Sequence, residues 1–115
     1  MRNYYFYIRD SRGFPVACVA AVNVSNDRAA LGISVFNPSD KYDRVLGRKI
    51  ALGRAQALIN RHPDSTDDLS HWVTGVNFKS DSYNKHICNL LQRLENDKVI
   101  MLPTRVSRVL KYNID

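Results

Sequence analysis

The sequence predicts a single α+β domain, residues 1–115, in which an antiparallel sheet packs against two helices. Three observations carry this prediction. The first forty residues contain three short runs of alternating apolar residues separated by turn residues, as in a strand meander. Two later segments repeat apolar residues at helical spacing, with one or two strand-like runs between and after them. A chain of 115 residues has the size of one domain and can bury a core of its own.

The N-terminal meander has three expected strands. Residues 4–9 are almost all aromatic or branched, and residues 16–24 carry an apolar side chain at every second position. The sequence DSRG between them is typical of a turn, and SND makes the next one. Leu31, Ile33 and Val35 then alternate on a third strand.

A first helix is expected at residues 41–61, with Ser39 or Asp40 as its N-cap. Gly47 and Gly53 lie inside it, and each glycine costs about 1 kcal/mol relative to alanine in a helix interior. We therefore expect another group to approach the helix backbone closely at these glycines. The sheet itself is one candidate, and a phosphate or a second chain is the other.

The second half of the chain is expected to add a strand and a helix. Residues 72–78 alternate as a fourth strand, after a polar, acidic loop at residues 63–70. A second helix follows Asp81 or Ser82, which supplies its N-cap, and ends near Asn96. Its apolar face comprises Tyr83, Ile87, Leu90, Leu91 and Leu94.

The C-terminal residues leave two alternatives open. Residues 99–102 are apolar and indicate a fifth strand. Residues 104–114 fit a helix, because basic residues recur there at every third position. The same segment also fits a strand, because its side chains alternate from Val106 to Tyr112.

The charge of the chain indicates the kind of partner it suits. Lys and Arg number 17 against 11 Asp and Glu, which gives a net charge of +6 and an isoelectric point near 9.6. This excess favours a polyanion such as nucleic acid, and arginine is suited to bidentate phosphate contacts. A basic surface that serves only solubility is the alternative.

The sequence indicates a cytoplasmic protein that does not enter a membrane. No apolar run approaches the roughly 20 residues that a spanning helix needs. The first ten residues lack the charged, apolar and small-residue order of a secretion signal.

Basic residues gather on the first expected helix, which carries Lys41, Arg44, Arg48 and Lys49. Three of them, Lys41, Arg44 and Arg48, share one sector of the helix. The opposite side carries Tyr42, Leu46, Ile50 and Ala57. We expect this apolar stripe to face the sheet and the basic stripe to contact a phosphate backbone, with a merely solvated basic face as the alternative. Additional anion contacts are expected from Arg54, Arg105, Arg108 and Lys111.

The first strand offers a second candidate surface. Alternation places Tyr5, Tyr7 and Arg9 together on one face of the sheet. If the helices cover the other face, these side chains form a stacking surface for unpaired bases. The alternatives are that a helix covers this face too, or that the tyrosines form the interface of a homodimer.

No catalytic motif is found, and we expect neither a metal nor a cofactor. The histidines, His62, His71 and His86, lack the spacing of metal ligands. Cys18 and Cys88 each lie within an apolar pattern, which favours buried, reduced thiols over a disulfide. The protein is therefore expected to be non-enzymatic.

A resemblance to bacteriophage sequences covers about a fifth of the chain, residues 33–57. VFNPSDKY, followed by GRKIALGRA, resembles short, mostly uncharacterised phage reading frames. Those frames carry a strand, a Pro-x-Asp turn and a helix of the Gly-Arg-x-Ile-Ala-x-Gly-Arg-Ala type. The resemblance implies a phage or prophage origin and the cytoplasm of a host cell. Small phage proteins tend to bind nucleic acid or to neutralise a host protein.

Two functional hypotheses follow. The first is a phage-type nucleic-acid-binding protein, with single-stranded DNA or RNA favoured, in which the basic helix holds the phosphates and the tyrosines contact bases. The second is a small inhibitor or sequestering module that binds a host defence or regulatory protein or a nucleotide signal, through a cluster such as Arg105, Arg108 and Lys111. The basic charge argues against mimicry of DNA, which requires an acidic surface.

Overall fold

The computed structural model describes residues 2–61, 69–75, 78 and 84–114. The elements are β1 (Arg2–Arg9), β2 (Pro15–Asn23), β3 (Arg28–Val35), α1 (Arg44–Asn60), β4 (Ser70–Thr74), α2 (Asn84–Asn96) and α3 (Thr104–Ile114). The four strands form one antiparallel sheet in the order β1-β2-β3-β4. The α+β class and the N-terminal meander are thus confirmed. No helix in these described ranges is long and apolar enough to cross a membrane.

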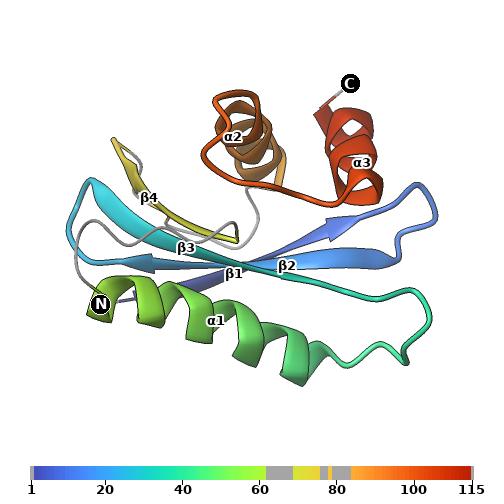
Figure 1. Ribbon diagram of the computed structural model, residues 1–115, viewed down its shortest axis with the longest axis horizontal. Helices are drawn as coiled ribbons and strands as arrows, with labels where there is room; N and C mark the ends of the chain where they lie inside the picture. Colours follow the sequence, from blue (N-terminus) through green and yellow to red (C-terminus); the bar gives the residue numbers. More distant parts are fainter. Residues whose placement is uncertain (1, 62–68, 76–77, 79–83, 115) are drawn as a thin grey trace.

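The sheet carries a helical layer on each face (Figure 1). α1 lies along one face, and α2 and α3 lie side by side on the other. Every residue of β2 from Ala17 to Val22 is buried. Both faces of this central strand are therefore covered, which accounts for its unbroken apolar sequence.

The two faces of the sheet differ in the size of their side chains. The face toward α2 and α3 bears large residues, including Phe6, Ile8, Val19, Leu31 and Ile33. The face toward α1 bears Cys18, Ala20 and Ala30. Because the side chains on this face are small, the backbone of α1 can pack close to the backbone of the sheet.

α1 approaches β3 most closely at Gly32. A Cβ atom added there would overlap the carbonyl oxygen of Ala51 and lie 2.5 Å from the amide nitrogen of Ala55. At Gly47 an added Cβ would lie 2.7 Å from Cζ of Phe36. At Gly53 it would meet nothing within 4 Å. Within the described residues a close approach is therefore found at Gly47 and not at Gly53, and the tightest contact lies on the strand.

The side of α1 that faces the sheet is not the one expected from the sequence. The buried residues of the helix are Gly47, Ala51, Ala55 and Leu58. Leu46 and Ile50 are 51% and 40% exposed, and Tyr42 is 45% exposed. The expected apolar stripe is wrong because the sheet opposite is lined by alanine and glycine, which small helix residues match better than large ones.

α1 also begins later than expected. Asp43, rather than Ser39 or Asp40, caps it, because its carboxylate accepts a hydrogen bond from the amide of Leu46 at 3.1 Å. The earlier residues form a turn, in which the amide of Ser39 donates to the side chain of Asn37 at 3.0 Å.

Three helices occur in the described part of the chain, where two were expected. Residues 104–114 form α3, which settles the ambiguity of the tail. Residues 99–102 connect α2 to α3, and the expected fifth strand is wrong. Lys98 adopts a left-handed conformation (φ 61°) that ends α2, and Ile100 is buried in the core. The apolar residues at 99–102 therefore hold the α2–α3 connection against the core instead of pairing with a strand.

β4 is displaced from the expected residues 72–78, since it begins at Ser70 and ends at Thr74. Gly75 follows with φ 75°, and its amide donates to the carbonyl of Asp27 at 2.6 Å, so the chain turns there. Phe78 is buried against Phe6, with ring centroids 5.5 Å apart. Of the loop expected at 63–70, residues 63–68 lie outside the described residues, and Ser70 belongs to β4 instead. The expected N-caps Asp81 and Ser82, and Tyr83, also lie outside the described residues.

The close contact at Gly32 can be tested by adding one methyl group. Gly32→Ala should lower the free energy of unfolding by about 1–3 kcal/mol or more, because the methyl group overlaps the backbone of α1. Gly53→Ala, the matched control, should raise it by up to about 1 kcal/mol, because the site is open and alanine favours the helix. Denaturant melts measure both values. Equal effects of the two changes would contradict this packing.

The assignment of the core can be tested with two leucines. Leu91 of α2 is fully buried in the core between the helix and the sheet, so Leu91→Ala should lower the free energy of unfolding by about 2–5 kcal/mol. Leu46→Ala, at a half-exposed position on α1, should change it by about 0.5 kcal/mol or less. The same melts suffice. A large loss of stability at Leu46 would restore the apolar stripe expected from the sequence.

Candidate anion-binding site

α1 places two arginines beside the aromatic side chains of β1. Arg44 and Arg48 are one helical turn apart and lie on one side of the helix. Nε of each donates a hydrogen bond to the hydroxyl oxygen of Tyr7, at 3.1 Å from Arg44. The basic side of the helix and the aromatic side of the strand, expected separately from the sequence, thus meet at one place.

Three guanidinium groups surround two tyrosine rings there. The guanidinium carbon of Arg48 lies 4.9 Å from the ring centre of Tyr5 and 5.4 Å from that of Tyr7. Those of Arg44 and Arg9 lie 5.3 Å and 5.5 Å from the Tyr7 ring. Each distance is within the range of a cation–π interaction. We call these five residues the arginine–tyrosine cluster.

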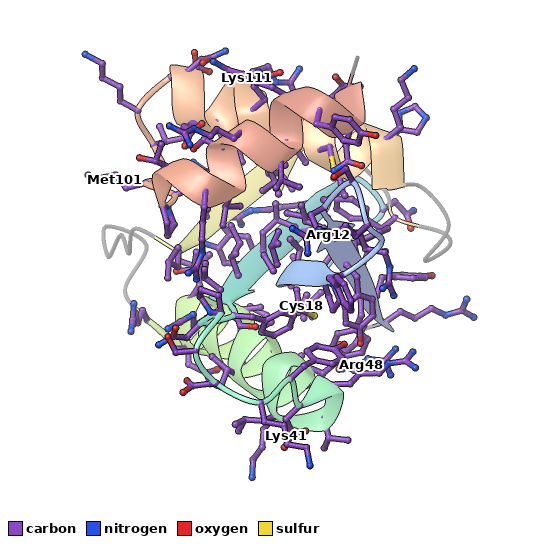
Figure 2. The ribbon with its side chains drawn as sticks, turned by 90° about the vertical axis from the view of Figure 1, so that its right-hand side faces the viewer. Arg12, Cys18, Lys41, Arg48, Met101 and Lys111 are labelled. Atoms are coloured by element: carbon purple, nitrogen blue, oxygen red, sulfur yellow. The ribbon has the colours of Figure 1, made fainter. Side chains whose placement is uncertain are left out.

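The sheet register explains why these side chains meet. Tyr5 and Tyr7 pair across the sheet with Ala20 and Cys18 of β2. α1 lies over β2 and β3, so β1 runs beside the helix (Figure 1). Because the β2 side chains are small, the long arginine side chains can pass over them and reach the tyrosines. Figure 2 shows Arg48 and Cys18 on this side of the molecule.

Within the described residues, no ion pair balances the positive charge of the cluster. Among residues 2–61, 69–75, 78 and 84–114, none forms an ion pair with Arg9, Arg44 or Arg48. The hydrogen bond to Tyr7 raises the pKa of Arg44 above its ordinary value, so this group stays charged. Uncompensated charge of one sign attracts counter-ions of the other.

Cys18 beneath the cluster is an inert thiol. Burial raises the pKa of Cys18 to about 11, although the nearby Arg48 and Arg44 act to lower it. Burial likewise raises the pKa of Cys88 to about 11. Both cysteines are buried and free, as the apolar pattern around them predicts. Neither thiol is therefore a nucleophile at neutral pH.

The open stacking surface expected on β1 is wrong in one respect. Tyr5 and Tyr7 are half-buried, because a helix covers their side of the sheet and guanidinium groups lie on their rings. An unpaired base on these rings would therefore share them with the arginines. In this arrangement the tyrosines orient the arginines.

The remaining residues expected to bind anions are dispersed. Lys41 precedes α1 and Lys49 lies on it, and both are exposed. Arg54 is half-buried and donates to the carbonyl of Ile33 at 2.5 Å, and Arg105 donates to the carbonyl of Phe36. Arg108 and Lys111 are exposed on α3, on the other side of the sheet from α1. Figure 2 shows Lys111 near the top of the molecule and Arg48 in its lower part.

Sequence reasoning missed a pocket of about 670 Å³ next to the first turns of α1. Its walls come from the β1–β2 turn, the end of β3, the connection to α1, α1 itself and Arg105 of α3. The only hint in the sequence is the apolar character of Leu46 and Ile50, which line the pocket. On the sequence alone, that character favours a position against the sheet. In the described part of the chain, no group of three His, Cys, Asp or Glu side chains could hold a metal ion.

The comparisons with known proteins leave the arrangement of side chains as the guide to function. No protein-family model matches the chain, and no significant match was found among curated proteins or solved structures.

Proposed function

We propose that the protein is a non-enzymatic nucleic-acid-binding protein and that its arginine–tyrosine cluster contacts the phosphates. The observation that supports this most directly is the convergence of Arg44 and Arg48 on the hydroxyl of Tyr7, with no ion pair to either arginine in the described part of the chain. Each guanidinium uses Nε for this bond, so its two terminal nitrogens remain for a phosphate. Arg9 adds a third cation over the same ring.

Two further properties favour a single-stranded ligand. Arginine guanidinium planes stack on unpaired bases as well as contact phosphates. The cluster lies between α1 and β1, the strand at one end of the strand order, where a flexible nucleic-acid strand can pass beside α1. The net charge of +6 supplies a general attraction to polyanions. A protein of this kind would act in the cytoplasm, that of the host cell if the gene is carried by a phage.

The proposal predicts a charge effect that depends on position. Arg44→Ala with Arg48→Ala should weaken binding to a single-stranded oligonucleotide and lower its salt slope by about 0.7 for each phosphate that the variant no longer neutralises. Arg108→Ala with Lys111→Ala is the matched control, because it also removes two positive charges, taking +6 to +4. These residues lie on α3, on the other side of the sheet from α1. Fluorescence anisotropy over a range of salt concentrations measures both slopes.

Equal reductions of affinity in the two double variants would mean that only the overall charge matters. An absence of wild-type binding at roughly micromolar protein and low salt, where even non-specific binding is detectable, would remove the proposal. The second hypothesis, a module that binds a host protein or a nucleotide signal, would then be preferred.

The role of the tyrosine hydroxyl can be tested without changing any charge. Tyr7→Phe keeps the ring but removes the acceptor shared by Arg44 and Arg48, so binding should weaken by about 1 kcal/mol while the salt slope stays nearly constant. Tyr112→Phe, at a 62% exposed position on α3, is the control and should bind as the wild type does. Unchanged binding by Tyr7→Phe would show that the hydroxyl does not orient the arginines for the ligand.

A further inference from the structure

The pocket beside α1 is separate from the arginine–tyrosine cluster, since none of the five cluster residues lines it. Its volume of about 670 Å³ falls within the range of about 300–1,000 Å³ that is usual for small-molecule sites. It is formed where the β1–β2 turn, the end of β3 and the first turns of α1 meet. Segments distant in sequence therefore build one concave surface.

Apolar side chains are exposed at this pocket to an unusual degree. Phe14 is 62% exposed, Leu46 51%, Tyr42 45% and Ile50 40%, and all four line the pocket. The ring of Phe36 meets that of Tyr42 edge to face at 5.1 Å and adds to the same wall. Exposed apolar residues concentrated in a concavity are typical of a binding site.

Two arginines anchored to the backbone supply positive charge at this wall. Arg54 donates to the carbonyl of Ile33 and Arg105 to the carbonyl of Phe36, each through one terminal nitrogen. Their other guanidinium nitrogens form no hydrogen bond within the described ranges. A guanidinium fixed at one nitrogen keeps further donors for a carboxylate or phosphate.

The other charged groups of the lining leave this positive charge in excess. They are Arg12, Lys41, Asp10, Asp40 and Asp43. The carboxylate of Asp10 accepts from the amides of Arg12 and Phe14 at 2.9 Å and 3.0 Å, and that of Asp43 caps α1. Two of the three acids are thus engaged by backbone amides.

Among the described residues, one polar group of the lining has no hydrogen-bond partner. Ser34 is 2% exposed, and its hydroxyl forms no hydrogen bond within the described residues. It lies behind Gly47, where a Cβ atom would be 3.6 Å from its oxygen. Buried hydroxyls are generally hydrogen-bonded, so an unpartnered one at a pocket marks a place for a polar ligand atom.

We propose that this pocket binds a small organic anion, whose apolar body lies against Phe36, Leu46 and Ile50 and whose carboxylate or phosphate contacts Arg54 and Arg105. The aromatic and aliphatic wall would contact the apolar body of the ligand. The guanidinium groups, each bonded to the backbone through one nitrogen, would contact its charged head. This site is independent of nucleic-acid binding by the arginine–tyrosine cluster.

Titration with the fluorescent anion 1-anilinonaphthalene-8-sulfonate, an aromatic body with one anionic group, tests the site on the whole folded chain. Leu46→Gln should weaken binding of this probe about tenfold or more, because it places a polar, uncharged side chain in the apolar wall. Val45→Gln is the matched control: Val45 is the adjacent residue, is 76% exposed, does not line the pocket, and should leave binding unchanged. Circular dichroism verifies that both variants are folded. Equal weakening by the two variants, or no binding by the wild type, would overturn the proposal.

Competition distinguishes the head groups. Decanoate and decyl phosphate should displace the probe, and the stronger of the two identifies the head that the site prefers, whereas uncharged decanol should compete at least about tenfold more weakly. Arg105→Gln should reduce this difference between anion and alcohol. Decanol competing as well as the anions would show that the guanidinium groups do not bind a ligand. The Arg44→Ala, Arg48→Ala variant should retain wild-type affinity for the probe, which separates this result from that on nucleic acid.

Discussion

The arrangement of this protein depends on the absence of a side chain at Gly32. There the backbone of α1 lies directly on β3, so the helix has little freedom to roll about its own axis without collision. At about 100° per residue, contact through Ala51 and Ala55 places Arg48 on one flank of the helix and Ile50 on the other. The first flank meets the tyrosines of β1, and the second forms a wall of the pocket. One missing methyl group therefore sets the position of both candidate sites.

The side chains of the arginine–tyrosine cluster are already restricted in the free protein. Long arginine side chains normally lose much rotational freedom when they bind a ligand, and this loss opposes binding. Here the ring and hydroxyl of Tyr7 already restrict Arg44 and Arg48, so part of that loss has occurred in the free protein. The arrangement also holds like charges close together, and an anion between them would relieve their mutual repulsion. Charge and rigidity thus favour the same kind of ligand.

The sequence predicts where the elements of this protein lie better than it predicts the face that α1 turns toward the sheet. Alternation and turn residues locate β1, β2 and β3, and the one-sided spacing of Ile87 and Leu91 locates α2 with its core face. The predicted face of α1 is wrong because it follows side-chain size, whereas the opposing strand contains Gly32 and selects alanine. The left-handed residue Lys98, which ends α2 and separates it from α3, has no signature in the sequence. The individual residues of the cluster are predictable, but their meeting requires knowing which strands α1 covers. The pocket could not be predicted for the same reason, because its walls come from segments whose relative positions the sequence does not show.

The two cysteines lie in different layers of the molecule. Cys18 is enclosed between the sheet and α1, and Cys88 of α2 is enclosed on the opposite side. The sheet separates them, so they cannot join within one folded chain, and the fold has the same covalent structure in reducing and oxidising surroundings. Each thiol becomes reactive only when its own helical layer moves away from the sheet. The rates at which the two are alkylated therefore report separately on the detachment of α1 and of α2, and they show whether the two layers open together or one at a time.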